Sequence, residues 1–185
     1  MILNIRGTSG SGKSTLVVKV MDTFFKKTPI MINGRRQPYG YWCRTPGQTP
    51  LYVPGHYEIA CGGCDTIKTP GQVYDMIRGM LEGNEPCNVL YEGIMVQDIS
   101  IAKDIQVCRE LGITVLGLKT PIDECLAAVR SRRAEKGNDK PLDPTNTISR
   151  AKAVTRKLDR LADAGVKVKR LSREDALAFV ISSLR

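Results

Sequence analysis

The residues whose types and spacing point most directly to chemistry lie near the start of the chain, where residues 7–14 read GTSGSGKS. This run matches the pattern G-x-x-x-x-G-K-[ST], in which a glycine-rich loop points successive backbone N–H groups at phosphate oxygens. In this pattern we expect Lys13 to reach the terminal phosphates and the Ser14 hydroxyl to ligate Mg²⁺. The sequence therefore predicts a site for ATP or GTP with magnesium, although a loop without nucleotide is the simpler alternative. The predicted nucleotide-binding residues are Gly7, Thr8, Ser9, Gly10, Ser11, Gly12, Lys13, Ser14 and Thr15.

Three arginines near the end of a predicted helix suggest how charge on a transferred phosphate is stabilised. Arg130, Arg132 and Arg133 precede a polar loop, so residues 130–145 are predicted to form a mobile arginine lid, with Arg130 and Arg133 as candidate catalytic residues. An ordinary basic helix end, favoured by the helix dipole, explains the same residues. The chain contains no Asn-Lys-x-Asp sequence for reading guanine, which favours ATP over a GTPase role.

A carboxylate follows a compact apolar run at the place where a strand is predicted to end. This residue, Glu92, can act as the general base for an acceptor hydroxyl or belong to the Mg²⁺ shell, and a plain strand-end carboxylate is the third reading. Asp65 and Asp98 are the other carboxylates near predicted substrate loops. The residues alone leave open which carboxylate is the base.

Residues 29–68 differ from the rest of the chain because glycine, proline and aromatic residues alternate there. We interpret this segment as a β-rich substrate insertion in which Gly-Gly allows close backbone approach to a ligand and aromatic rings stack on an unpaired base. Cys61, Cys64 and His56 have poor spacing for zinc, and no thioredoxin-like context supports a redox role. The candidate substrate or DNA residues are Arg35, Arg36, Tyr41, Trp42, Arg44, His56, Tyr57, Gly62, Gly63 and Asp65.

The periodicity of apolar residues predicts the elements that must position these side chains. Short apolar runs at 1–5, 88–91 and 113–118 are typical of buried strands, 166–171 is predicted as the last strand, and amphipathic segments between them are typical of helices. Such alternation predicts an α/β fold, a kinase-like parallel sheet between helices, in a single domain over 1–185. Ligands bind at the carboxyl ends of the strands in these sheets, where both the glycine-rich loop and Glu92 fall.

The charge balance favours a polyanionic partner. Lys plus Arg number 28 against 19 for Asp plus Glu, giving a formal charge of +9. Lys140 and a helix face bearing Lys152, Arg156 and Arg160 are candidates for a nucleic-acid backbone track, and a solvated helix face is the alternative. No apolar run is long enough to span a membrane and no secretory signal is evident, so we expect a cytoplasmic protein with reduced cysteines.

Four sequence segments together carry a family resemblance. They are NIRGTSGSGKST at 4–15, GHYE at 55–58, GGCDTI at 62–67 and VLYEG at 89–93. This combination resembles the bacteriophage P-loop kinases that act on 5-hydroxymethyluridine in DNA, closely over the first half of the chain and more loosely at the lid. The resemblance implies transfer of the γ-phosphate of ATP to the hydroxymethyl oxygen of the modified base, inside the bacterial host, as a step in DNA hypermodification. It places Lys13 and Ser14 at ATP and Mg²⁺, and Asp65 and Glu92 near the acceptor.

Two other functions remain compatible with the sequence. A kinase of free deoxynucleoside monophosphates needs the same nucleotide loop and lid, but a closed pocket for a small acceptor. An ATP-dependent nucleic-acid-binding protein needs only Glu92 as a sensor of the phosphate. Because one fold hosts unrelated functions, the fold does not choose among them.

Overall fold

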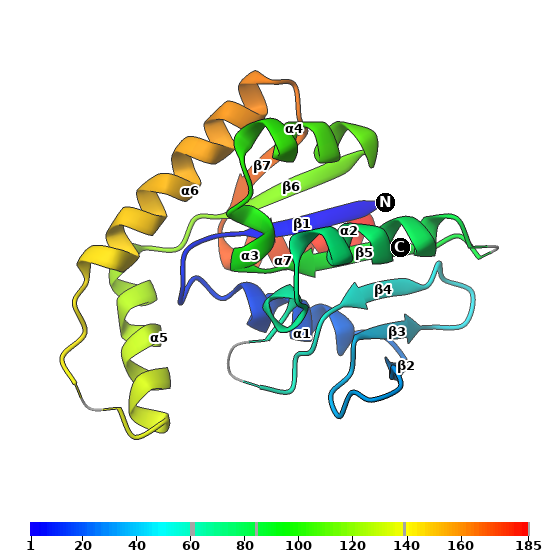
Figure 1. The fold of residues 1–185 in the computed structure, drawn as a ribbon, viewed down its shortest axis with the longest axis horizontal. Helices are drawn as coiled ribbons and strands as arrows, with labels where there is room; N and C mark the ends of the chain where they lie inside the picture. Colours follow the sequence, from blue (N-terminus) through cyan, green and yellow to red (C-terminus); the bar gives the residue numbers. More distant parts are fainter. Residues whose placement is uncertain (60–61, 84, 139, 185) are drawn as a thin grey trace.

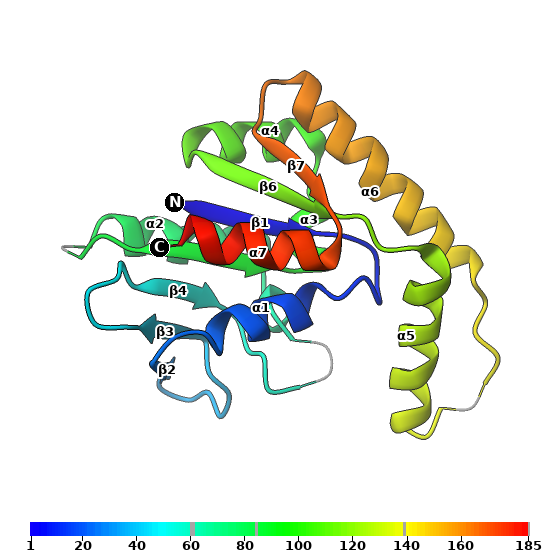
Figure 2. The same ribbon diagram turned by 180° about the vertical axis from the view of Figure 1, so that it is seen from behind.

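The structure is a computed structural model that describes residues 1–59, 62–83, 85–138 and 140–184. These residues form one seven-stranded sheet with helices on both faces, which confirms the predicted α/β class (Figures 1 and 2). The strands are β1 (Ile2–Arg6), β2 (Lys26–Ile30), β3 (Gly40–Arg44), β4 (Leu51–Pro54), β5 (Asn88–Glu92), β6 (Ile113–Leu118) and β7 (Val168–Leu171). The helices are α1 (Lys13–Met21), α2 (Pro70–Leu81), α3 (Ile94–Gln97), α4 (Ile101–Glu110), α5 (Ile122–Glu135), α6 (Thr145–Asp163) and α7 (Arg173–Ser183), with a 3-10 turn η1 (Cys64–Thr66).

The centre of the sheet is parallel and one edge is antiparallel. β1 lies between β5 and β6 and is parallel to both, and β4 and β7 extend the parallel part on either side. β2 and β3 add an antiparallel edge next to β4. The β-rich segment predicted at 29–68 therefore continues the central sheet. Ile5 of β1 is in register with Glu92 of β5. The loops that follow these two strands therefore begin side by side, at the carboxyl end of the parallel strands.

Alternating residues of the central strands fill two cores. On one face Ile2, Val89 and Val115 pack with side chains of α2, α4 and α6. On the other face Leu3 and Leu90 pack with α1 and α7, which cover the sheet in Figure 2. Strands buried on both faces in this way hold the loops at their carboxyl ends rigidly, and those loops carry the candidate site.

The helix pair α5 and α6 forms an arm at the side of the sheet. α5 projects away from the sheet (Figure 1). α6 then runs back beside the sheet before the chain enters β7. The segment predicted as a lid, 130–145, contains the end of α5, the connection and the first residue of α6. None of the helices among the described residues is both long and apolar enough to cross a membrane.

Three local features differ from the sequence expectations. The strand β2 was not predicted, because its sequence KKTPI is charged, contains proline and is exposed at the sheet edge. The helix α3 has only four residues, too few to produce a periodic pattern. The helix α1 ends at Met21, so Phe24, which the apolar spacing places on its buried stripe, lies beyond it.

Candidate active site

The glycine-rich loop joins β1 to α1 and adopts a backbone that requires glycine at particular positions. Gly10 has a φ of +79°, and an added Cβ would lie 2.2 Å from the backbone oxygen of Cys125. Gly12, at the N-terminus of α1, has a φ of +91°. Side chains rarely adopt these backbone angles, so the two glycines allow the loop to pack against α5 and turn directly into α1.

Lys13 is folded back onto its own loop. Its Nζ donates hydrogen bonds to the backbone oxygens of Gly7 and Thr8, both at 3.1 Å, and the residue is only 7% exposed. Burial lowers the pKa of the Lys13 ammonium, and the negative charge of Glu92 opposes that shift. The ammonium is thus held against the backbone oxygens of the glycine-rich loop.

Glu92 ends β5 and faces the start of α1. The Ser14 Oγ donates a hydrogen bond of 2.7 Å to Glu92 Oε1, and Glu92 is 2% exposed. Burial raises the pKa of the Glu92 carboxyl, while Lys13 and Ser14 partly offset the shift. Gly63, at a φ of +74°, allows the close approach, since a Cβ there would lie 2.3 Å from Oε1.

Asp65 has a different role in the geometry. Its Oδ2 accepts a hydrogen bond from the Ile94 N–H at 2.9 Å, and its Oδ1 accepts one from the Met95 N–H at 2.8 Å. Both carboxylate oxygens therefore cap the short helix α3, directly after the β5 strand that ends in Glu92. Asp65 fixes the substrate-side loop to this helix, and Asp98 lies at the other end of the same helix.

A pocket of about 340 Å³ joins these groups. It is lined by the glycine-rich loop, Lys13, Ser14, Gly62, Asp65 and Glu92, and α5 contributes Ala128, Arg132 and Glu135. The two arginines predicted to be catalytic in a lid, Arg130 and Arg133, line a separate pocket with Lys140. Helical phase explains the difference, because residues 128, 132 and 135 share one face of α5. That spacing is visible in the sequence and could have singled out Arg132.

A buried polar network supports the loop from behind. Arg6, at the end of β1, makes a bidentate pair with Asp104 of α4 at 2.6 and 2.7 Å, and both residues are almost completely buried. Gln97 donates from its amide nitrogen to the backbone oxygen of Gly7 at 3.2 Å. Lys157 of α6 binds Asp104 at 3.1 Å and the backbone oxygen of Ile99 at 2.6 Å. Sequence analysis missed this network because its members are far apart along the chain.

The structure corrects the expectation that the tyrosines of the substrate segment stack on a base. Tyr41 is 2% exposed and Tyr57 is 8% exposed, so both rings belong to the core behind the glycine-rich loop. His56 is also buried, and its Nδ1 lies 3.2 Å from the Tyr41 hydroxyl oxygen. Their contribution is therefore to hold the 55–67 segment against the sheet.

The remaining candidates of this segment lie at its surface or outside the described residues. Arg44 is paired with Glu85 and lies 5.0 Å above the Trp42 ring. Arg35 donates to the backbone oxygen of Thr66 at 2.8 Å, and Arg36 is exposed. Of the two cysteines weighed for zinc, Cys64 is buried, and Cys61 lies outside the described residues.

Comparison with known proteins supplies the family. A protein of Pseudomonas phage PaMx11 named 5-hmdU DNA kinase is 37% identical over 177 residues, which cover 95% of this chain and 92% of that protein. This chain belongs to the 5-hmdU DNA kinase family. Two further phage proteins with the same name are similar to this kinase: that of Delftia phage PhiW-14 is 27% identical over 89% of this chain and 65% of its own length, and that of Bacillus phage SP10 is 23% identical over 90% and 26%. A scan against protein-family models gave no match. The family relationship confirms the resemblance identified from the sequence.

Proposed function

We propose that this kinase transfers the γ-phosphoryl group of ATP to the hydroxymethyl oxygen of 5-hydroxymethyluridine within DNA. The observation that carries the proposal is the 2.7 Å contact between Ser14 and Glu92 beside the buried Lys13, in a single pocket at the carboxyl ends of β1 and β5. This arrangement places a phosphate-binding cation, a hydroxyl and a carboxylate around one small space. The relatives named 5-hmdU DNA kinase supply the class of acceptor.

The ATP site would extend over two adjoining pockets. Backbone N–H groups of the glycine-rich loop and the N-terminus of α1 would bind the phosphates. A second pocket of about 210 Å³ shares Gly12, Thr15 and Arg173 with the first and is also lined by Leu16 and Leu177. Leu16 and Leu177 would contact the faces of the adenine base, and Lys19, Arg173 and Glu174, which also line this pocket, would contact the polar edge of the nucleotide.

The donor set beside Lys13 fits Mg²⁺. Ser14 Oγ is a hard oxygen ligand next to the Glu92 carboxylate, and magnesium is usually held by protein oxygens together with phosphate oxygens and water. Among the described residues no cluster of three or more His, Cys, Asp or Glu side chains suggests a cage for another metal. When bound, Mg²⁺ would neutralise charge on the phosphates of the nucleotide. Ser14 is the residue that would ligate it directly, and Glu92, which accepts the Ser14 hydrogen bond, would orient that ligand without binding the ion itself.

The protein groups would divide the transfer step among them. Glu92 would accept the proton of the acceptor hydroxyl, and the oxygen of that hydroxyl would form a bond to the γ-phosphorus of ATP. The bond between the γ-phosphorus and the β,γ-bridging oxygen would break at the same time, which releases ADP. Lys13 and Arg132 would stabilise the negative charge on the transferred group. Asp65 would keep α3 and the Gly62–Gly63 backbone in place next to the acceptor. The raised pKa of Glu92 makes it a stronger base than an ordinary glutamate.

A competition experiment tests this assignment against a kinase of free nucleotides. The enzyme is given γ-labelled ATP and Mg²⁺ with DNA containing 5-hydroxymethyluracil, or with a panel of free deoxynucleoside monophosphates. We expect label in the DNA, and inhibition of that transfer by excess duplex DNA that lacks 5-hydroxymethyluracil but not by the monophosphates. Label only on free nucleotides would overturn the proposal, and ATP-dependent DNA binding without transfer would indicate a nucleic-acid-binding protein.

A further inference from the structure

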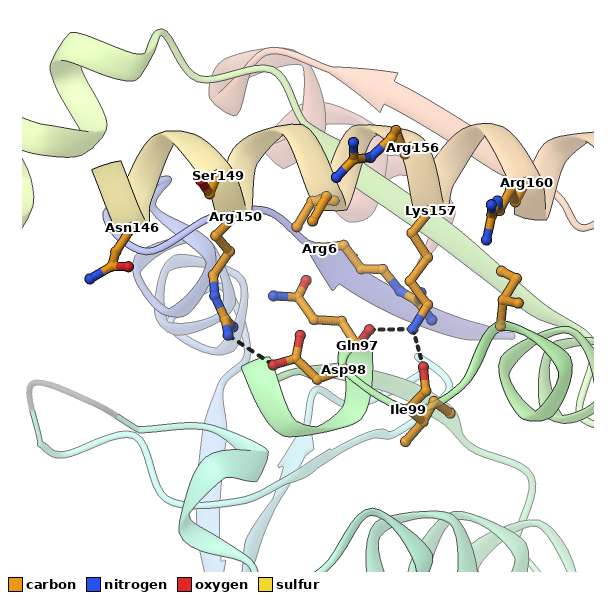
Figure 3. Close-up of a pocket in the computed structure, with 13 residues that line it drawn as sticks. Arg6, Gln97, Asp98, Ile99, Asn146, Ser149, Arg150, Arg156, Lys157 and Arg160 are labelled. Atoms are coloured by element: carbon orange, nitrogen blue, oxygen red, sulfur yellow. Dashed lines mark hydrogen bonds and ion pairs between the residues drawn. The ribbon is translucent and has the colours of Figure 1, made fainter. Parts of the chain in front are cut away.

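A second and larger cavity lies beside the candidate active site, between α6 and the segment 97–101 (Figure 3). Its volume is about 890 Å³, and its walls combine apolar and cationic side chains. Ile99, Ile101 and Val154 provide the apolar part, and each of them also packs against the core. Nothing in the transfer step described above uses this cavity.

The cavity carries a strong positive charge that the protein only partly neutralises. Five cations line it, namely Arg6, Arg150, Arg156, Lys157 and Arg160, with Asp98 as the only carboxylate in the lining. Asp104, behind the wall, binds Arg6 and Lys157. Five positive charges thus face two negative ones, in a concave site where the field is concentrated.

Three of these cations have hydrogen-bonding capacity to spare. Arg150 reaches across the cavity to Asp98 at 3.0 Å through one nitrogen, but its other terminal nitrogen is buried without a hydrogen-bond partner among the described residues. Arg156 and Arg160 are exposed, and Figure 3 shows them on α6 without a link to the other residues drawn. By contrast, the Lys157 ammonium binds Asp104 and backbone oxygens at 97 and 99.

The position of the cavity relates it to the active site. The short helix α3 connects the two sites. Its first residue, Ile94, lines the pocket that contains Lys13 and Glu92, and its last residue, Gln97, lines the larger cavity. Four helical residues span about 6 Å, so the two sites lie one helical turn apart. Along α6, the ten residue steps from Arg150 to Arg160 cover about 15 Å, a length over which a polynucleotide strand presents more than one phosphate.

We propose that this cavity, defined by Arg150, Arg156 and Arg160 of α6 and by Ile99 and Ile101 opposite, binds the phosphate backbone of the substrate DNA strand next to the nucleotide that receives the phosphate. The inference rests on the proposed function for its choice of polyanion. The spare arginine donors bind phosphate oxygens, and the apolar wall contacts the sugars. The cavity thereby supplies the preference for a polymer over a free nucleotide.

The test is the salt dependence of DNA binding by a double variant. The protein with Arg156→Ala and Arg160→Ala is titrated into a labelled single-stranded oligonucleotide containing 5-hydroxymethyluracil at several salt concentrations. Losing two phosphate contacts should weaken binding about tenfold at moderate salt. The plot of log association constant against log salt concentration has a negative slope, and its magnitude should fall by about 1.4. The matched control, Lys26→Ala with Lys167→Ala, removes two exposed lysines on β2 and on the turn before β7 and should bind as the wild type does.

Phosphate transfer measured on the same proteins separates this inference from the proposed function. We expect the double variant to have a raised KM for DNA and an unchanged kcat with saturating DNA. Equal affinity, salt slope and KM in the double variant and the wild type would overturn the cavity assignment while leaving the transfer reaction intact. Weakened binding in the double variant alone, with no transfer by the wild type, would support the cavity and refute the proposed function.

Discussion

At the residue scale, Lys13 and Glu92 hold opposite charges in a site from which water is almost excluded. Burial lowers the pKa of Lys13 below its ordinary value of 10.5 and raises the pKa of Glu92 above its ordinary value of 4.5. In the proposed mechanism, transfer requires a protonated Lys13 and an ionised Glu92. Because of these two pKa shifts, the pH range in which Glu92 is ionised and Lys13 is protonated in the free enzyme is narrower than for an ordinary glutamate and lysine.

The pH profile of kcat/KM for DNA should show this narrowing. We expect activity to fall on the acid side at a pH above 4.5, as Glu92 is protonated, and on the alkaline side at a pH below 10.5, as Lys13 loses its proton. Initial rates across pH at constant ionic strength provide the measurement. An acid limb at or below pH 4.5 would contradict the role assigned to Glu92.

A pair of variants decides which carboxylate is the base. Glu92→Gln should lower kcat at least about 100-fold, because the amide cannot take the hydroxyl proton. Asp65→Asn should mainly raise KM and keep the acid limb, since Asp65 holds α3 through hydrogen bonds from two backbone N–H groups. Loss of the acid limb in Asp65→Asn with a normal profile in Glu92→Gln would reverse the two assignments.

The assignment of the phosphate-binding lysine has its own test. Lys13→Ala should reduce transfer at least about 100-fold through the loss of a cation at the transferred group, with an unchanged circular dichroism spectrum. Initial rates at saturating ATP and DNA measure the effect. Activity within a few-fold of the wild type would place the ATP site elsewhere.

At the scale of elements, the phase of α5 determines which arginine enters the pocket. Arg132 shares its face with Ala128 and Glu135 and lines the nucleotide pocket, while Arg130 and Arg133 line another. Arg132→Ala should therefore reduce kcat about 100-fold, and Arg130→Ala, the control on the same helix, only a few-fold. Steady-state rates for both variants give the comparison. A larger loss in Arg130→Ala would mean that α5 rotates or bends when substrates bind.

The buried ion pairs that connect β1, α4 and α6 should contribute strongly to the free energy of unfolding. Asp104 is fully buried and neutralises Arg6 and Lys157, so Asp104→Ala leaves two cations without their partner. We expect a loss of about 3 to 5 kcal/mol in the free energy of unfolding, which corresponds to roughly 10 °C in Tm. Thermal unfolding measures it, and a shift of less than about 1 °C would show that the pair is energetically neutral.

The same pair makes a prediction about acid. The hydrogen bonds and charge of Arg6 outweigh burial and lower the pKa of Asp104 below its ordinary value of 3.8. Its contribution to stability is then complete above the unfolded pKa and is lost as the pH falls through the folded one. Wild-type unfolding free energy should drop over that range below pH 3.8, and the drop should be smaller in Asp104→Ala.

At the scale of the whole molecule, the sequence predicts the parallel centre of the fold better than its edges. The strands around 1–5, 88–91 and 113–118 are apolar and buried, so local composition identifies them, and the strand at 166–171 is marked only by alternating apolar and cationic residues. The edge strand β2 and the short helix α3 depend on partners outside their own segments, β3 for β2 and Asp65 for α3. Composition alone does not record such partners.

The residues of the candidate site also differ in whether the sequence alone predicts them. The glycine-rich loop and Glu92 were predicted because a local motif and a strand end mark them. Tyr41 and Tyr57 were expected at the surface because aromatic residues in a loop-rich segment can stack on bases, but they fill the core beneath the loop. Arg156 and Arg160 were candidates from the sequence for contact with nucleic acid, but Gln97 and the cavity itself were not predicted, since the cavity arises only when α3 and α6 meet beside β1.

The most direct test of the account locates the transferred phosphate chemically. DNA containing 5-hydroxymethyluracil is incubated with the enzyme, ATP and Mg²⁺, digested by nuclease to mononucleotides without phosphatase, and analysed by mass spectrometry and phosphorus NMR, with Glu92→Gln as the control. The account predicts one added phosphate on the 5-hydroxymethyl oxygen in the wild-type reaction and almost none in the Glu92→Gln reaction. Unmodified 5-hydroxymethyldeoxyuridine monophosphate after complete digestion, or phosphate found only at strand ends, would contradict it.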